Sequence, residues 1–199
     1  MTTIKISIAQ PTDAPAIAAL ANQHTYQQLD AEARRGGFLT GAFSVPGVQA
    51  MLASVPGQVA YQQDELAGFV LNSRLSPAHY PPLVQEIIAL LPQLHFRQRA
   101  LATYRWFFYG PVLVQPAFRG HGLLPQLFQA SHQTLAGHYE LGIAFIAEGN
   151  TTSLRLHIHK LGLEVVGQHV FEGTTYVLLV FLVGAAEALP GASSAGSGA

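Results

Sequence analysis

The sequence predicts one mixed α/β domain, and three observations support this fold class. Apolar residues alternate or run together in some segments, as in strands, and recur at helical spacing in others. The two kinds of segment are interleaved along the chain, which is typical of a sheet covered by helices. The length of 199 residues suits a single domain with a sizeable core. We expect this domain to span residues 1–183.

The first part of the chain contains three predicted strands and two predicted helices. Ile4, Ile6 and Ile8 alternate with polar residues, which indicates a strand. Thr12 and Ser44 have the short polar side chains that commonly begin helices. The expected elements are a strand at 4–8, a helix at 12–24, a short helix after Ser44, and strands at 58–62 and 66–72.

Residues 76–103 form a predicted helical insertion between the third and fourth strands. Apolar residues from Leu83 to Leu91 have helical spacing, and prolines precede and follow them. This pattern predicts one helix. We interpret Leu94 to Tyr104 as a second helix.

Four strands and two helices are expected after the insertion. They are a strand at 106–114, a helix from 123 to about 137, a strand at 141–147, a helix at 151–160, and strands at 164–171 and 174–183. Residues 184–199 are rich in Gly, Ser and Ala, and we expect them to form a disordered tail.

The composition argues against several classes of function. The net charge is −1 and the pI is near 6.7, whereas a nucleic-acid binder normally has a basic surface. Cysteine is absent, which excludes disulfides, thiolate metal sites and a cysteine nucleophile. His157 and His159 are two residues apart on a predicted helix, so they face different directions and cannot share a metal. We therefore expect neither nucleic acid nor metal as a ligand.

The location of the protein is also predicted from sequence patterns. The first residues lack the basic start and apolar run of a secretory signal. The longest apolar run near the C-terminal end, Tyr176 to Val183, is far shorter than the roughly 20 residues of a membrane helix. We expect a soluble, cytoplasmic protein without a membrane partner.

The most informative segment runs from Val112 to Leu124 and reads VLVQPAFRGHGLL. An apolar strand leads through a glycine-containing loop into an amphipathic helix. The first N–H groups of a helix are free and carry partial positive charge, so they attract anions. Gly120 and Gly122 let a phosphate approach the backbone, and Arg119 adds a cation. The segment predicts a phosphate site, with a tight turn that binds nothing as the alternative.

Two motifs resemble those of the GNAT superfamily of acyl-CoA N-acyltransferases. VLVQPAFRGHGLL is similar to the pattern V-x-P-x-[YF]-R-G-x-G, with Leu124 where the signature has Gly or Ala. NTTSLRLHIHKLGLEVVG, residues 150–167, resembles N-x-x-S-x-x-x-[YH]-x-K-x-G-F. Lys160 and Gly162 lie one residue later than the family pattern places them, so we expect a shifted or bulged helix end. The resemblance implies a GNAT fold: a mixed, mostly antiparallel sheet of six to seven strands flanked by helices.

This resemblance implies acetyl-CoA as the acyl donor. In the family, backbone amides of the first motif hold the coenzyme A pyrophosphate. The implied contacts in this chain are Arg119, Gly120, His121, Gly122, Leu123, Leu124 and Asn150. When the resemblance is set aside, Asn150 is best interpreted as the residue that caps a helix.

The resemblance also implies a bulge at Gly110 and Pro111, where the fourth and fifth strands separate around the pantetheine arm. The N–H of Leu113 or Val114 could then polarise the acyl carbonyl. The alternative for Gly110 and Pro111 is an irregular strand edge.

The implied reaction is direct attack of a primary amine on the thioester. His157 stands where the family usually has Tyr, and histidine suits proton transfer at neutral pH. We expect His157 to be the proton donor, with packing or capping as the alternative. Glu148 is the candidate base, with a surface role as the alternative, and Tyr109 is a weaker candidate.

The acceptor is expected to contact Tyr26, Arg34, Phe38 and Tyr109. Arg34 and Arg35 could orient a carboxylate, or they could simply end a helix. A small-molecule amine is favoured, and a protein N-terminus or lysine stays open. The insertion could reshape the acceptor pocket or form a homodimer contact.

Two other classes of function stay open. One is a GNAT-fold protein that binds acyl-CoA without catalysis and acts as a sensor or scaffold. Leu124, and His157 in place of Tyr, motivate this alternative. The other is an interaction domain that binds no coenzyme.

Overall fold

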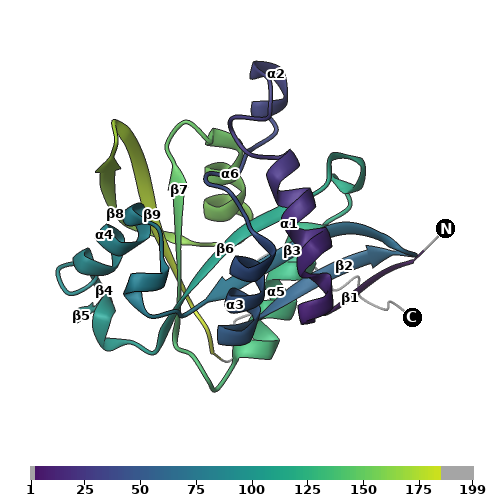
Figure 1. The fold of residues 1–199 in the computed structure, drawn as a ribbon. Helices are drawn as coiled ribbons and strands as arrows, with labels where there is room; N and C mark the ends of the chain where they lie inside the picture. The colour runs from purple at the N-terminus through teal and green to yellow at the C-terminus, as the bar shows by residue number, and fades with distance from the viewer. Residues whose placement is uncertain (1–2, 185–199) are drawn as a thin grey trace, which may run out of the picture.

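A computed structural model describes residues 3–184, and its centre is a seven-stranded sheet (Figure 1). The strand order is β1-β2-β3-β6-β7-β9-β8. The strands are β1 (Ile4–Ile8), β2 (Val55–Gln62), β3 (Glu65–Ser73), β6 (Trp106–Val114), β7 (Leu141–Ala147), β8 (Glu164–Phe171) and β9 (Thr174–Leu182). Every neighbouring pair is antiparallel except β6 and β7. The predicted mixed, mostly antiparallel sheet is confirmed.

Helices cover both faces of this sheet. The α-helices are α1 (Ala14–Gln23), α2 (Ala31–Arg34), α3 (Val45–Ser54), α4 (Pro82–Leu90), α5 (Leu123–Leu135) and α6 (Thr151–Arg155). Short 3-10 turns lie at Pro11–Asp13, Pro77–His79, Leu101–Thr103 and Pro116–Phe118. The side chains of α1 and α3 share one core with β2 and β3, whereas those of α5 share another core with the opposite face of the sheet. Ser44 caps α3 as predicted, because its hydroxyl accepts the N–H of Gly47.

The insertion differs in part from the prediction. Its helix α4 forms where expected, and it packs over β6, β7 and β9 in a third core. The prediction of a second helix across residues 94–104 is wrong. That segment contains a two-stranded hairpin of β4 (His95–Phe96) and β5 (Arg99–Ala100), followed by the 3-10 turn. Tyr104 fixes the hairpin by donating its hydroxyl to the carbonyl of Phe96, at 2.7 Å.

The predicted irregularity in β6 is confirmed, and it changes which face each side chain occupies. Val112 pairs with Val70 of β3, but Tyr109 pairs with Asn72, so β6 has one extra residue at Gly110 and Pro111. Such a bulge reverses the alternation of side chains. Residues 107 and 109 face the α5 core before the bulge, and residues 112 and 114 face it afterwards.

The helix end after Asn150 is also irregular, as the late Lys160 and Gly162 predicted. The chain continues from α6 into a π-helical turn, Leu156–Lys160. A π turn accommodates one additional residue within a helix. It therefore explains why the end of the second motif is one residue late.

The predicted tail begins at residue 184, and residues 185–199 lie outside the described residues. Among the helices of residues 3–184, none is long and apolar enough to cross a membrane.

Candidate active site

The loop between β6 and α5 carries a row of backbone donors without acceptors. We call residues 120–124 the cradle. Among the residues that the structure describes, no acceptor takes the N–H groups of the cradle, whereas the next N–H, that of Gln126, already bonds to the carbonyl of Gly122. Pro125 has no N–H to offer. The row lies at the N-terminus of α5, where the helix dipole adds positive charge. Such an arrangement can bind a phosphate or diphosphate.

The cradle keeps its N–H groups accessible through its glycines and its two leucines. Gly120 and Gly122 have φ angles of +85° and +73°, a region that favours glycine. Leu123 is buried, and Leu124 is half-buried against the α5 core. Because both leucine side chains point into the core, they do not cover the backbone donors. The His121 side chain is exposed beside them.

Arg119 makes two hydrogen bonds to the backbone, and its expected contact with the coenzyme stays a prediction. Its Nε donates to the carbonyl of Val114 at 3.0 Å, and its Nη1 donates to the carbonyl of Gly36 at 3.0 Å. The guanidinium thus bonds to the backbone at the end of β6, five residues away, and to the distant chain after α2. We assign Arg119 a positioning role: it joins the end of β6 to the chain that follows α2.

Beside the cradle, β6 and β7 separate. They pair only between Trp106–Phe108 and Leu141–Ile143, and the rest of both strands is unpaired on this side. The N–H of Gln115 bonds to Ala67 of β3, at 2.9 Å. Since N–H groups alternate in direction along a strand, the N–H of Leu113 also points toward β3, and that of Val114 points into the opening. Of the two expected donors, Val114 is the one that faces the gap.

Tyr109 and His157 meet where β6 and β7 separate, on the α5 side of the sheet. Their ring centroids are 5.9 Å apart. Both side chains are buried, and the hydroxyl of Tyr109 has no hydrogen-bond partner among residues 3–184. A buried hydroxyl without a partner is uncommon in folded proteins, so it indicates a place where a ligand or water completes the site.

The protonation of His157 follows from its contacts. Its Nδ1 lies 2.8 Å from the carbonyl oxygen of Ser153. A carbonyl only accepts, so Nδ1 carries the proton, and Nε2 of the neutral ring is an acceptor. Burial lowers the pKa of His157, although the bond to Ser153 opposes this effect. The ring is therefore neutral at pH 7, and its first step would be to accept a proton rather than donate one.

The pKa of Tyr109 shifts in the opposite direction. Burial raises the pKa of its hydroxyl well above the ordinary value. It therefore keeps its proton at neutral pH and cannot be the base. The phenol can donate a hydrogen bond instead.

A short segment after α2 crosses the open end of the site. We call residues 35–40 the strap. Its carbonyls accept from three side chains that are far away in sequence: Arg119 bonds to Gly36, Asn150 Nδ2 to Phe38 at 2.8 Å, and Thr152 Oγ1 to Arg35 at 2.7 Å. Thr40 also bonds to Tyr176 at the start of β9. The strap thus connects the end of β6 to the start of α6.

Asn150 is buried and does two structural tasks. Its Oδ1 accepts the N–H of Ser153 at the start of α6, which confirms the cap, while its Nδ2 bonds to the strap. Its contact with the coenzyme stays a prediction. Thr152 and Gly36 were not singled out from the sequence, because only contacts between distant segments link them to the site. Ser153 stood in the second motif.

Three of the expected acceptor residues come together beside the strap. The guanidinium of Arg34 lies 3.9 Å from the ring centroid of Tyr26, and its Nε donates to the Tyr26 carbonyl at 2.9 Å. Phe38 contacts the same ring edge-on at 5.0 Å between centroids. A hollow of about 320 Å³ adjoins this cluster and is lined by Glu32 and Arg119 among others. Tyr109, the fourth expected residue, lies with His157 instead.

Glu148 lies just beyond the end of β7 and is exposed. Its N–H bonds to the carbonyl of Thr175, but its carboxylate has no hydrogen bond within residues 3–184. Four residues of β7 separate Glu148 from the last pair with β6, at Ile143. This spacing corresponds to more than about 13 Å along the strand. Among residues 3–184 no hydrogen bond joins Glu148 to His157, and the role of Glu148 as a base stays a prediction.

Metal ligands are not clustered in the described part of the chain. Within residues 3–184, no group of three or more His, Asp or Glu side chains is placed to hold a metal ion.

Comparison with known proteins supports the fold through structure alone. No family model matches the sequence, and no curated protein matches it. A putative acetyltransferase, YncA, from Salmonella typhimurium with acetyl-CoA aligns with a TM-score of 0.60 at 18% identity, over 96% of this chain and 99% of that one. Arabidopsis thaliana NAA60 with acetyl-CoA aligns with a TM-score of 0.61 at 13% identity, over 91% and 100%.

A third structure carries the family name. It is the acetyltransferase of the GNAT family from Streptococcus pneumoniae, with a TM-score of 0.56 at 17% identity, over 91% of this chain and 100% of that one. All three alignments span nearly the whole of both chains, and they agree with the observed sheet and its flanking helices. The chain therefore has the GNAT fold.

Proposed function

We propose that this protein is an N-acetyltransferase of the GNAT superfamily that moves an acetyl group from acetyl-CoA to a primary amine. The observation that carries the proposal is the cradle: free N–H groups at the start of α5, next to the gap between β6 and β7. A diphosphate fits the cradle by charge and by hydrogen bonding. The adjoining gap offers unpaired backbone groups to an extended, amide-containing arm such as pantetheine.

The reaction follows from the groups at the gap. The amine nitrogen attacks the thioester carbonyl carbon, and the carbonyl oxygen takes up negative charge. In this proposal the N–H of Val114, which faces the gap, stabilises that charge. Collapse then breaks the C–S bond and releases the thiolate of coenzyme A.

One proton must travel from the attacking nitrogen to the leaving sulfur. Neutral His157 has a free acceptor at Nε2, so we assign it to take the proton from nitrogen and return it to sulfur. Tyr109 stays protonated, and its unpartnered hydroxyl can donate a hydrogen bond to the sulfur. His157 was expected to be a proton donor from the start, whereas in this scheme it first accepts the proton and then donates it. The scheme does not need Glu148.

The acceptor enters under the strap in this proposal. The Tyr26, Arg34 and Phe38 cluster combines two aromatic rings with one cation. It suits a small amine with an apolar part better than a polycation, because Arg34 would repel a second positive charge. A homodimer and a cytoplasmic location stay predictions.

Release of free thiol from acetyl-CoA in the presence of a panel of primary amines tests the proposal. Turnover with at least one small amine is the expected result. Binding of acetyl-CoA without turnover on any amine would favour the alternative, a catalytically inactive GNAT-fold sensor or scaffold.

A further inference from the structure

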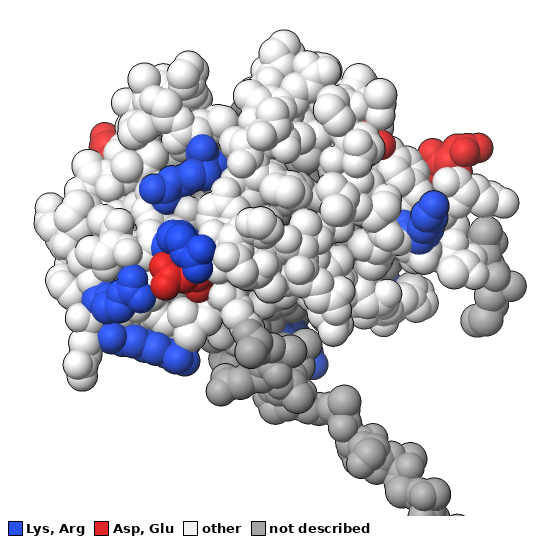
Figure 2. Space-filling model, turned by 90° about the horizontal axis from the view of Figure 1, so that it is seen from below, with Lys and Arg blue, Asp and Glu red and all other residues white. Residues whose placement is uncertain are grey.

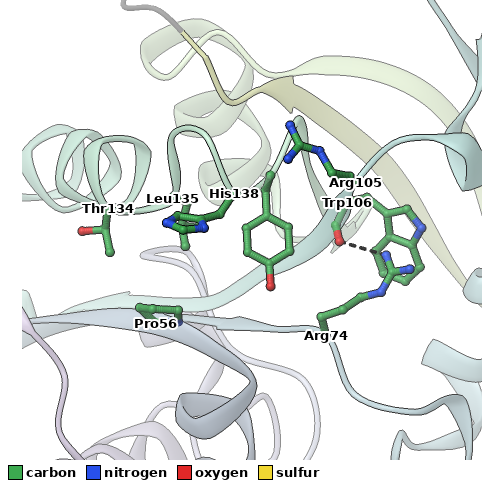
Figure 3. Close-up of a pocket in the computed structure, with 8 residues that line it drawn as sticks. Pro56, Arg74, Arg105, Trp106, Thr134, Leu135 and His138 are labelled. Carbon is green, nitrogen blue, oxygen red and sulfur yellow. Dashed lines mark hydrogen bonds between the residues drawn. The ribbon is translucent and has the colours of Figure 1, made fainter.

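A hollow of about 570 Å³ lies at the end of the molecule opposite the cradle (Figure 3). Arg74 and Pro56 line one side, Thr134, Leu135 and His138 line another, and Arg105 and Trp106 close it. This volume is within the range of small-molecule sites. None of these residues belongs to the candidate active site.

Two elements show how far the hollow lies from the cradle. Trp106 is the first residue of β6, and the cradle follows its last residue, so the length of β6 corresponds to about 27–30 Å. Leu135 is the last residue of α5 and the cradle begins that helix, which corresponds to about 20 Å. A ligand bound at one site therefore does not reach the other.

The hollow carries excess positive charge. The Arg74 guanidinium lies 3.4 Å from the ring centroid of Trp106, and its Nη1 donates to the Trp106 carbonyl at 2.8 Å. Among residues 3–184, Arg74 has no acidic partner. Arg105 shares a single carboxylate, Glu140, with Arg99. Of the two arginines that line the hollow, Arg105 shares its acid with Arg99, and Arg74 has none. Figure 2 shows basic side chains gathered around acidic atoms on one face of the molecule.

The rest of the lining offers apolar surface and donors. Leu135, Pro56 and the indole of Trp106 supply apolar walls. The hydroxyl of Tyr139 and the ring of His138 also line the hollow, and neither makes a side-chain hydrogen bond within the described chain. Partial burial of Arg74 lowers the pKa of its guanidinium, which reflects lost hydration that an anion would replace.

We propose that this hollow is a second ligand site, which binds a small organic carboxylate with an apolar body. The carboxylate would lie between Arg74 and Arg105, and the apolar body would lie against Leu135 and Pro56. An arginine held flat on an aromatic ring presents its N–H edge in a fixed orientation, which suits a carboxylate. The proposal is independent of the acetyltransferase assignment.

Trp106 provides a direct readout, because it is the single tryptophan of the chain. Its fluorescence would be titrated with benzoate and with benzamide, a neutral compound of nearly the same shape. We expect a saturable change with benzoate and at least tenfold weaker binding of benzamide. Acetate should also bind more weakly than benzoate, since it lacks the apolar body.

Two variants and one control test the assignment of the arginines. Arg74→Gln and Arg105→Gln should each weaken benzoate binding by about five- to tenfold, whereas Arg97→Gln should change it less than about twofold. Arg97 lies over Phe96 in the same basic region but does not line the hollow. The Arg105 side chain is 61% exposed, so its replacement should leave the fold intact even if that of Arg74 does not. Equal binding of benzoate and benzamide, or no effect of Arg105→Gln, would overturn the proposal.

Discussion

The cradle and the strap lie beside the same opening, but they are built from different kinds of interaction. The cradle consists of consecutive residues whose backbone donors are left free by two glycines and by the start of α5. The strap is held by side chains that are more than 80 residues away in the sequence, namely Arg119, Asn150 and Thr152. The site for the acyl donor is therefore local in sequence, and the region assigned to the acceptor depends on the tertiary fold.

The largest effect should come from closing the cradle. Gly122→Val places a β-branched side chain at a φ of +73° among the free N–H groups. We expect acetyl-CoA affinity to fall by about 100-fold or more, which calorimetric titration would measure. Gly137→Val is the matched control, since Gly137 has a φ of +82° just beyond the other end of α5. Both variants should lose similar stability, and only Gly122→Val should lose binding. Equal affinity in the two would contradict the cradle assignment.

A second large effect should appear in turnover without a change in donor binding. His157→Phe removes the acceptor Nε2, and we expect kcat to fall by about 100-fold with acetyl-CoA affinity nearly unchanged. His132→Phe is the control, because His132 is another largely buried histidine whose pKa is lowered by burial, and it contacts Phe181. Comparable losses of kcat in both variants would remove His157 from the proton path.

Weakening the strap should affect the acceptor more than the donor. Asn150→Ala removes a helix cap and the bond to Phe38, and we expect about 1–2 kcal/mol loss of unfolding free energy. Thr152→Val removes one bond and should cost about 0.5–1.5 kcal/mol. Both should raise the KM for the amine several-fold, as steady-state kinetics would show. Thr152→Val should change the Kd for acetyl-CoA less than about twofold in calorimetry, whereas Asn150→Ala also removes the predicted contact with the coenzyme. A larger effect of Thr152→Val on acetyl-CoA binding would place the strap in the donor site.

The smallest expected effect is on stability in mild acid. Burial lowers the pKa of His157 and His132 in the folded protein. The unfolded chain therefore binds more protons than the folded protein below the ordinary histidine pKa of about 6.5, and stability falls as pH decreases through that region. The melting temperature should be lower near pH 5.5 than near pH 7.5. His157→Gln should reduce this slope, and an unchanged slope would show that the ring is already exposed.

Sequence patterns predicted most of the elements that build the cradle. The bounds of β6 and β7 agree with the prediction because both strands are continuous apolar runs between clear breaks. The displaced Lys160 and Gly162 predicted an irregular helix end, and the π turn is its physical form. The free N–H groups follow from glycines and a helix start, which are local features.

The hairpin at residues 95–100 could not be predicted in the same way. Its turn residues, Arg97 and Gln98, both have positive φ, at +46° and +65°. Such two-residue turns normally contain Asn or Gly, so the sequence carries no turn signal there. A second helix across Leu94 to Tyr104 was expected there instead. The hairpin forms because its apolar side chains complete the core under α4.

The bond from Arg119 Nη1 to the carbonyl of Gly36 could not be predicted for a different reason, because it depends on how α2 packs. The choice between Leu113 and Val114 likewise required the register with β3, because alternation fixes direction only once the partner strand is known.

The most direct measurement of the central claim is the melting temperature of the protein with and without acetyl-CoA. A ligand that binds only the folded state adds about 2.7 kcal/mol of stability at one hundred times its Kd. We expect a clear rise in the melting temperature at millimolar acetyl-CoA, which Gly122→Val abolishes and Gly137→Val retains. No rise in the unmodified protein would contradict the assignment of the cradle to the acyl donor.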